Sequence, residues 1–175
     1  EIYRLELLEK LGKINNTGNT TINNITNNNN IINNIIVVNS IGKENVEYIT
    51  SKMLSQLWKG VKCVEEGVAK TIKMIHGNKD HPENHNIVYT NLKSNAALVK
   101  LGDAFEYKNI NEVFKDVSTN TLDNIVLGPQ FDDLSRIIKE KYESVCDDEE
   151  MNNKANNMTR IELYNSYKNG SVKKP

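Results

Sequence analysis

The hydrophobic positions of the first forty residues follow a heptad pattern. From residue 8 to residue 36, one apolar, Asn or Gly position recurs at alternating steps of three and four. This spacing places those positions on the a and d sites of a continuous coiled-coil frame. They are Leu8, Leu11, Asn15, Gly18, Ile22, Ile25, Asn29, Ile32 and Ile36. Because a single helix cannot bury such a seam, the pattern predicts an oligomeric coiled-coil stalk over residues 1–38.

The residue types in this seam favour a trimer. Ile at both a and d positions favours three or four strands over two, so we expect a parallel homotrimer. Asn15 and Asn29 occupy a positions, where amides fix the register, and their ring could also hold a small anion or a water. The alternative is an intertwined β-stalk, because 11 of the 20 residues from Asn15 to Asn34 are Asn, interleaved with Ile and Thr. The spacing of three and four favours the helical form.

Beyond the stalk, the apolar pattern predicts an α+β head domain over residues 39–146. The β-branched run at 35–38 suggests a short strand leading into it. Two helices are expected at helical apolar spacing, followed by three strands joined as an antiparallel meander, with a tight turn at Gly102 and Asp103. These elements cover residues 46–58, 61–76, 86–93, 96–101 and 104–108.

The last third of the chain is expected to be helical. Asn109 or Asn111 can cap a helix that carries Val113, Phe114 and Val117, and a short turn follows from Thr121 to Gly128. A strong amphipathic helix is then expected to open at Pro129 and to bear Phe131, Leu134, Ile138, Tyr142 and Val145. Residues 147–150 are acidic, the wrong sign for a helix C-terminus, so residues 147–175 are interpreted as a solvated linker and a small helix from Thr159 to Tyr167.

Composition narrows the class of protein. The 22 Lys and Arg residues nearly balance the 23 Asp and Glu residues, so the whole molecule has no long-range attraction for nucleic acid or anionic membrane. The two cysteines, Cys63 and Cys146, fit a reducing compartment better than a disulfide scaffold. No run of about eighteen apolar residues is present, and charges near the start disfavour a signal peptide. These features predict an intracellular protein without a membrane partner.

Two short motifs resemble uncharacterised proteins of large DNA viruses of the mimivirus type. In those proteins an Ile/Asn-rich repeat precedes an N-S-F-G-K-E-N motif and an H-P-E-N-H-N-I loop. Here residues 39–45 match the first motif, with Ile41 in place of Phe, and residues 81–87 match the second. The resemblance covers residues 20 to about 108. It implies a viral protein of the virion or of a viral replication compartment, and it brings no established activity.

The loop after residue 76 contains the only residues that suggest metal chemistry. His76, His81 and His85 lie within ten residues, and three imidazoles could hold zinc with an open fourth position. A nuclease of the His-Asn-His type is disfavoured, because nine residues cannot supply the hairpin and helix between its ligands. The alternative is a hydrogen-bonded surface loop in which His and Asn side chains satisfy turn backbone groups.

Basic residues on two of the expected helices could contact phosphates. They are Lys62, Lys70, Lys73, Arg136, Lys139 and Lys141. Acidic residues alternate with them along the same helices, which is equally typical of a solvated surface.

Taken together, the patterns predict a non-enzymatic, homotrimeric viral structural, scaffold or adaptor protein without a cofactor, whose partners are its own copies and other viral proteins. A nucleic-acid-binding protein with aligned basic helices is the alternative, followed by a metal-dependent nuclease.

Overall fold

The computed structural model of the protein describes residues 36–128, 131–173 and 175. Residues 38–175 form one compact unit, here called the folded unit. Eight of the nine seam positions lie outside the described residues, and Ile36 is the exception. The stalk therefore stays a prediction. Ile36 itself is exposed in the single chain.

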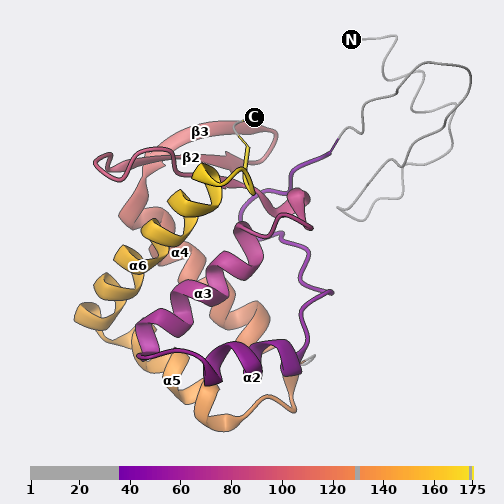
Figure 1. Cartoon of the computed structure of the whole chain (residues 1–175), viewed down its shortest axis with the longest axis vertical. Helices are drawn as coiled ribbons and strands as arrows, with labels where there is room; N and C mark the ends of the chain where they lie inside the picture. Colours follow the sequence, from indigo (N-terminus) through magenta and orange to yellow (C-terminus); the bar gives the residue numbers. More distant parts are fainter. Residues whose placement is uncertain (1–35, 129–130, 174) are drawn as a thin grey trace, which may run out of the picture. The chain divides into compact units, whose positions relative to one another are not determined.

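The folded unit belongs to the α+β class, as predicted. Helices gather around one central helix, and a small sheet lies at one end of them (Figure 1). The described helices are α2 (Ser51–Lys59), α3 (Val64–His76), α4 (Ile110–Thr121), α5 (Arg136–Asp147) and α6 (Glu149–Lys168), with a 3-10 turn η1 (Pro82–Asn84) and a π-helical turn η2 (Leu122–Val126). Helix α3 contacts each of the other four α-helices.

The predicted meander is confirmed. Strands β1 (Ile87–Val88), β2 (Ala96–Leu101) and β3 (Ala104–Asn109) pair antiparallel in the order β1-β2-β3. Leu101 lies opposite Ala104, so Gly102 and Asp103 form a two-residue turn, and Gly102 has a φ of 55° that suits glycine. Strand β1 has two residues instead of the eight expected, because the chain turns soon after it, where the Ser94 N–H donates to the Asn91 carbonyl at 3.0 Å.

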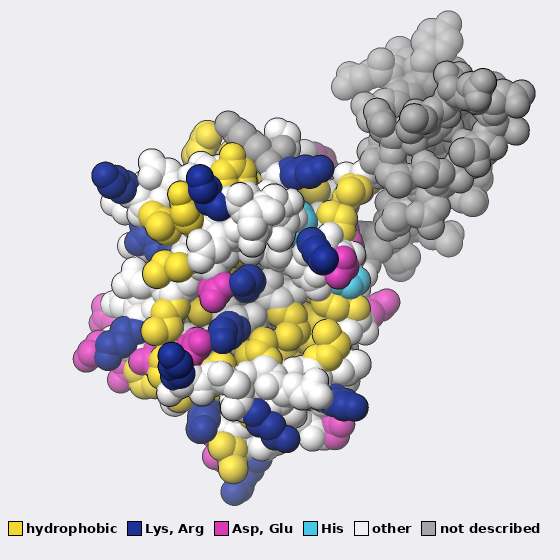
Figure 2. All heavy atoms as spheres, viewed as in Figure 1, with side chains coloured by type: hydrophobic (Ala, Val, Ile, Leu, Met, Phe, Trp, Pro, Cys, Tyr) yellow, Lys and Arg dark blue, Asp and Glu magenta, His cyan; other side chains and the backbone are white. Residues whose placement is uncertain are grey.

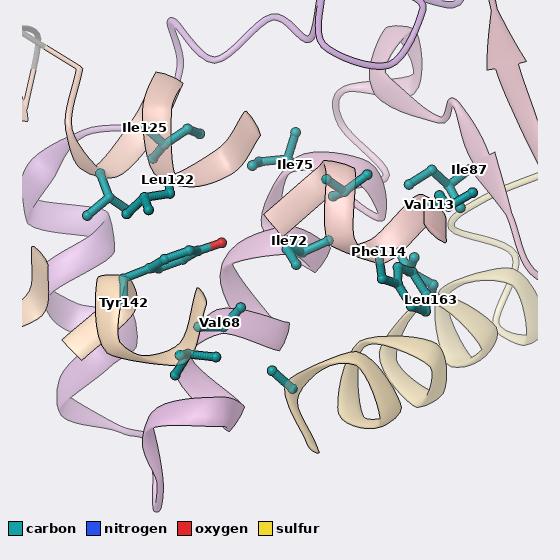
Figure 3. Close-up of a cluster of buried hydrophobic side chains, with 14 of the residues drawn as sticks. Val68, Ile72, Ile75, Ile87, Val113, Phe114, Leu122, Ile125, Tyr142 and Leu163 are labelled. Atoms are coloured by element: carbon teal, nitrogen blue, oxygen red, sulfur yellow. The ribbon is translucent and has the colours of Figure 1, made fainter. Parts of the chain in front are cut away.

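The core fills the space between the helices and one face of the sheet. Figure 3 shows its side chains converging from α3, α4, α5 and α6, with the Tyr142 ring among aliphatic residues. Apolar residues recur at helical spacing on α3, where Val68, Ile72 and Ile75 are all buried. A close approach of α2 to α3 depends on Gly67, since a Cβ there would lie 2.7 Å from the Trp58 ring.

Two expectations for the last third of the chain are wrong. Helix α5 begins at Arg136 instead of Pro129, because Phe131 and Leu134 are buried by successive turns that bond three residues back. The acidic run is no linker: Asp148 caps a 20-residue helix, α6, by accepting from the Met151 N–H at 2.8 Å. Carboxylates at a helix N-terminus have the favourable sign, so the acidic run marks a helix start.

Candidate functional site

The two motifs at residues 39–45 and 81–87 meet in one hydrogen-bonded cluster. Asn84, at the end of η1, is fully buried and lies against the segment of residues 39–45. Its Oδ1 accepts from the Asn45 backbone N–H at 2.8 Å and from Asn39 Nδ2 at 3.2 Å. Its Nδ2 donates to the Asn45 carbonyl at 2.7 Å. Both ends of the Asn84 amide therefore hold the first motif against the second.

A second series of hydrogen bonds includes His76 at the end of α3. Its Nδ1 lies 2.6 Å from Asn86 Oδ1, and Asn86 Nδ2 donates to Glu44 Oε1 at 2.8 Å. The Gly42 N–H donates to the same oxygen of Glu44 at 3.0 Å. Because Asn86 uses its NH₂ group on the carboxylate, its oxygen is left to accept from the imidazole.

The other two histidines have separate partners. His81 stacks on Tyr48 with the ring centroids 3.4 Å apart, and its Nδ1 lies 3.1 Å from Glu83 Oε1. His85 Nε2 lies 2.7 Å from the Asn78 carbonyl. The surface loop expected over residues 77–85 is exposed at Lys79 and Asp80, but its last two residues, Asn84 and His85, are buried.

Burial determines the protonation of this cluster. Burial lowers the pKa of His76, and the nearby Glu44 and Asn86 offset only part of this shift. Burial also lowers the pKa of His85. Burial also raises the pKa of the Tyr48 hydroxyl to about 12. Both His76 and His85 are therefore neutral at pH 7.

The predicted metal set of His76, His81 and His85 is not assembled. Within the part of the chain that the structure describes, no three His, Cys, Asp or Glu side chains are placed to hold a metal ion. Each imidazole instead contacts an amide, a carboxylate or a carbonyl, which is the hydrogen-bonded alternative. His76 is 2% exposed and offers no surface to a substrate.

The candidate phosphate-binding residues do not form a free basic surface. Lys70 pairs with Glu66 at 2.8 Å, Lys73 with Glu162 at 2.5 Å and Arg136 with Glu140 at 3.3 Å. Lys62, Lys139 and Lys141 complete the set and make no ion pair within the described chain. In Figure 2, basic and acidic side chains are scattered over the visible face without a single basic patch. The arrangement is that of a mixed solvated surface.

A polar cleft that sequence reasoning missed lies between α4, the end of α5 and α6. It has a volume of about 500 Å³, within the range of small-molecule sites. We call it the α4–α6 cleft; its lining residues are Asn111, Glu112, Lys115 and Thr119 from α4, Cys146 and Asp147 from α5, and Glu149, Asn152, Asn153 and Asn156 from α6. The interpretation of residues 147–150 as a linker hid it, because four of its ten lining residues come from the first two turns of α6.

The cleft does not present an activated nucleophile. Burial, helped by the nearby carboxylates of Asp147, Asp123 and Glu143, raises the pKa of the Cys146 thiol to about 11. At pH 7 this thiol is protonated, and a thiol is a far weaker nucleophile and metal ligand than a thiolate. Cys63 and Cys146 are both free. The cleft therefore offers polar and charged groups to a ligand but no thiolate.

No described helix is both long enough and apolar enough to cross a membrane. Comparison with protein-family models, with curated proteins and with solved structures finds no match for this chain.

Proposed function

We propose that this protein is a non-enzymatic, homotrimeric scaffold or adaptor, assembled through residues 1–38 and presenting the folded unit as a repeated binding module. The observation that carries the proposal is the unbroken alternation of three and four over residues 8–36. Three linked copies of one module gain avidity for a partner that displays several sites, without any new contact. A virion or a viral replication compartment is the setting that the resemblance implies.

The side chains of the folded unit support a non-catalytic role. The histidines of residues 76–85 are held by hydrogen bonds or stacking, and the buried ones are neutral. The Cys146 thiol is protonated, and the carboxylates near it raise its pKa further instead of stabilising a thiolate. The nucleic-acid alternative is weaker, because three of its six basic residues are already paired with Glu.

Substitutions within the seam test the proposal. Ile25→Lys with Ile32→Lys places two charges per chain at d positions, and we expect the trimer to dissociate to monomers in sedimentation equilibrium. Asn27→Lys with Asn30→Lys is the matched control, because these residues occupy f and b positions outside the seam and the trimer should persist. A wild-type chain that sediments as a monomer would overturn the proposal.

A further inference from the structure

Strand β3 forms one edge of the sheet. Among the described residues its only strand partner is β2, in the order β1-β2-β3. Five of its six residues are exposed, and Tyr107, at 69%, is the most exposed large hydrophobic residue of the described chain. In Figure 1 the hairpin of β2 and β3 lies at one end of the folded unit. Within the described chain, the outer edge of β3 is therefore free to accept another strand.

The ladder shows which backbone groups face this outer edge. The Lys100 N–H donates to the Asn86 carbonyl at 2.8 Å, and the Lys100 carbonyl accepts from the Ile41 N–H at 3.1 Å. Both backbone groups of Lys100 therefore point away from β3. Phe105 lies opposite Lys100 in a non-hydrogen-bonded pair, so its own N–H and carbonyl point outward. The same holds for Tyr107, two positions later.

The charges on β3 are complementary to those of a second β3 in the reverse direction. Glu106 and Lys108 flank Tyr107, and both side chains are half-exposed. When two copies pair antiparallel with Tyr107 opposite Tyr107, Glu106 lies opposite the partner's Lys108, and Lys108 lies opposite the partner's Glu106. These are non-hydrogen-bonded pairs, in which the side chains approach most closely and opposite charges stabilise the sheet.

The same charges disfavour the neighbouring registers. The outward backbone groups recur every two residues, so the pairing can shift only in steps that keep them opposite one another. With Tyr107 opposite the partner's Phe105, Glu106 would face Glu106. With Tyr107 opposite the partner's Asn109, Lys108 would face Lys108. Like charges directly opposite each other are destabilising, so the charge pattern selects the register centred on Tyr107.

We propose that the outer edge of β3 is a docking surface for a second copy of this chain, which adds its own β3 antiparallel across a two-fold axis at Tyr107. The two three-stranded sheets would then form one continuous sheet. Glu106 and Lys108 form an exposed ion pair within one chain, at 3.1 Å, which contributes little and can exchange for the cross-strand pairs. The proposal does not rest on the stalk, because it uses only residues of β3.

The contact is small, so we expect weak association. One six-residue strand from each copy buries less than the roughly 1,200 Å² of a stable interface, which suggests a dissociation constant of about 0.1 to 1 mM. The folded unit is then monomeric at low micromolar concentration. In stalk-linked assemblies, several such contacts would act together and connect one assembly to the next.

Sedimentation velocity of the full chain, from about 5 µM to 1 mM, tests this surface in the seam variant Ile25→Lys with Ile32→Lys, which excludes stalk assembly. We expect a monomer–dimer equilibrium. Glu106→Lys and Lys108→Glu each create two like-charge pairs and should each weaken dimerisation by about tenfold. An equimolar mixture of these two variants should dimerise as the parent does, because every Lys on β3 of one copy then faces a Glu of the other.

Two further variants separate the β3 edge from the rest of the surface. Tyr107→Pro removes the central outward N–H, and proline is tolerated on an edge strand at such a position, so dimerisation should be lost from a chain that still folds. Glu47→Lys is the matched control, because it makes the same charge change at an exposed residue outside β3 and should leave dimerisation unchanged. Circular dichroism shows whether each variant is folded.

Three results would overturn the proposal. The first is a parent chain that stays monomeric at about 1 mM. The second is a loss for Glu47→Lys equal to that for Glu106→Lys, or no recovery in the mixture, which would place the contact on another surface. The third is slow hydrogen exchange of the Phe105 and Tyr107 amides at every dilution, which would mean that another segment of the same chain occupies the edge.

Discussion

The side-chain oxygen of Asn84 lies 2.8 Å from the backbone nitrogen of Asn45, 39 positions earlier in the chain. The same amide returns a hydrogen bond to the Asn45 carbonyl. Asn45 lies in no strand, so no neighbouring strand can satisfy its backbone N–H and carbonyl. The buried side chain of Asn84 forms both of these hydrogen bonds instead. The two Asn-rich motifs are therefore parts of one structural clamp.

Replacement of Asn84 is expected to open this clamp. Asn84→Ala leaves the Asn45 N–H and carbonyl without their partner and removes one hydrogen bond of Asn39, at a cost of about 2 to 4 kcal/mol in the free energy of unfolding. Urea unfolding measures this change. Asn157→Ala, an exposed position on α6, is the control and should change stability by about 0.5 kcal/mol or less. Equal stabilities for the two variants would contradict the role of Asn84.

Acidification is expected to destabilise the folded unit before its carboxylates titrate. Burial lowers the pKa of His76 and His85 from 6.5 in the folded state, whereas the unfolded chain keeps the ordinary value. Below pH 6.5 the unfolded state thus binds more protons, so stability falls as the pH falls, by up to about 1.4 kcal/mol per pH unit for each histidine.

The measurement is the free energy of unfolding in urea at about pH 7.5, 6.5 and 5.5. His85→Gln should reduce the slope below pH 6.5, because one depressed imidazole is removed. A free energy that is constant or rises on acidification over this range would show that these histidines are not held neutral.

Gly67 and Gly60 are expected to respond to alanine in different ways. An Ala in the middle of a helix normally stabilises it by about 1 kcal/mol relative to Gly. Gly67→Ala should instead destabilise by about 1 to 3 kcal/mol, because its Cβ would meet the Trp58 ring. Gly60 has a negative φ and ordinary space around its Cβ, so Gly60→Ala should be close to neutral. Thermal midpoints of the two variants measure the difference; a stabilised Gly67→Ala variant would exclude the close α2–α3 approach.

Asp148 and Asp147 are adjacent but should have opposite effects. Asp148→Ala removes the N-cap of α6 and should cost about 1 kcal/mol. Asp147→Ala removes a negative charge from the C-terminus of α5 and should be neutral or stabilising by a few tenths of a kcal/mol. Chemical unfolding of both variants measures these effects, and a neutral Asp148→Ala would favour the linker interpretation.

The elements that could be predicted from the sequence are those in which turn residues, capping residues and apolar spacing all indicate the same structure. The Gly102 and Asp103 turn, the strands around it and the Asn109 cap of α4 were all recognisable, because turn chemistry and apolar spacing point to the same structure. The start of α5 was missed, because Phe131 and Leu134 have helical spacing while lying in turns. The bounds of α6 were missed, because one helix ends at Asp147 and the next is capped by Asp148 with no residue between them.

The candidate sites could be predicted from the sequence only in part, because tertiary contacts determine them. The histidines are close in sequence, yet their side chains diverge to Asn86, Tyr48 and Asn78, which only tertiary contacts determine. The α4–α6 cleft joins α4 residues to residues at least 27 positions later in the chain, so no local motif could reveal it. One signal was available: residues 149–156 place a Glu and three Asn on one side of a helix, once that segment is recognised as helical.

The most direct test of the account is the molecular mass in solution of the full chain and of residues 38–175. Light scattering after gel filtration, or sedimentation equilibrium, gives both values. We predict three times the 19.9 kDa chain mass for the full chain and a monomer for residues 38–175. A full chain with the mass of one copy, or a trimer that persists without residues 1–37, would contradict assembly through the N-terminal heptads.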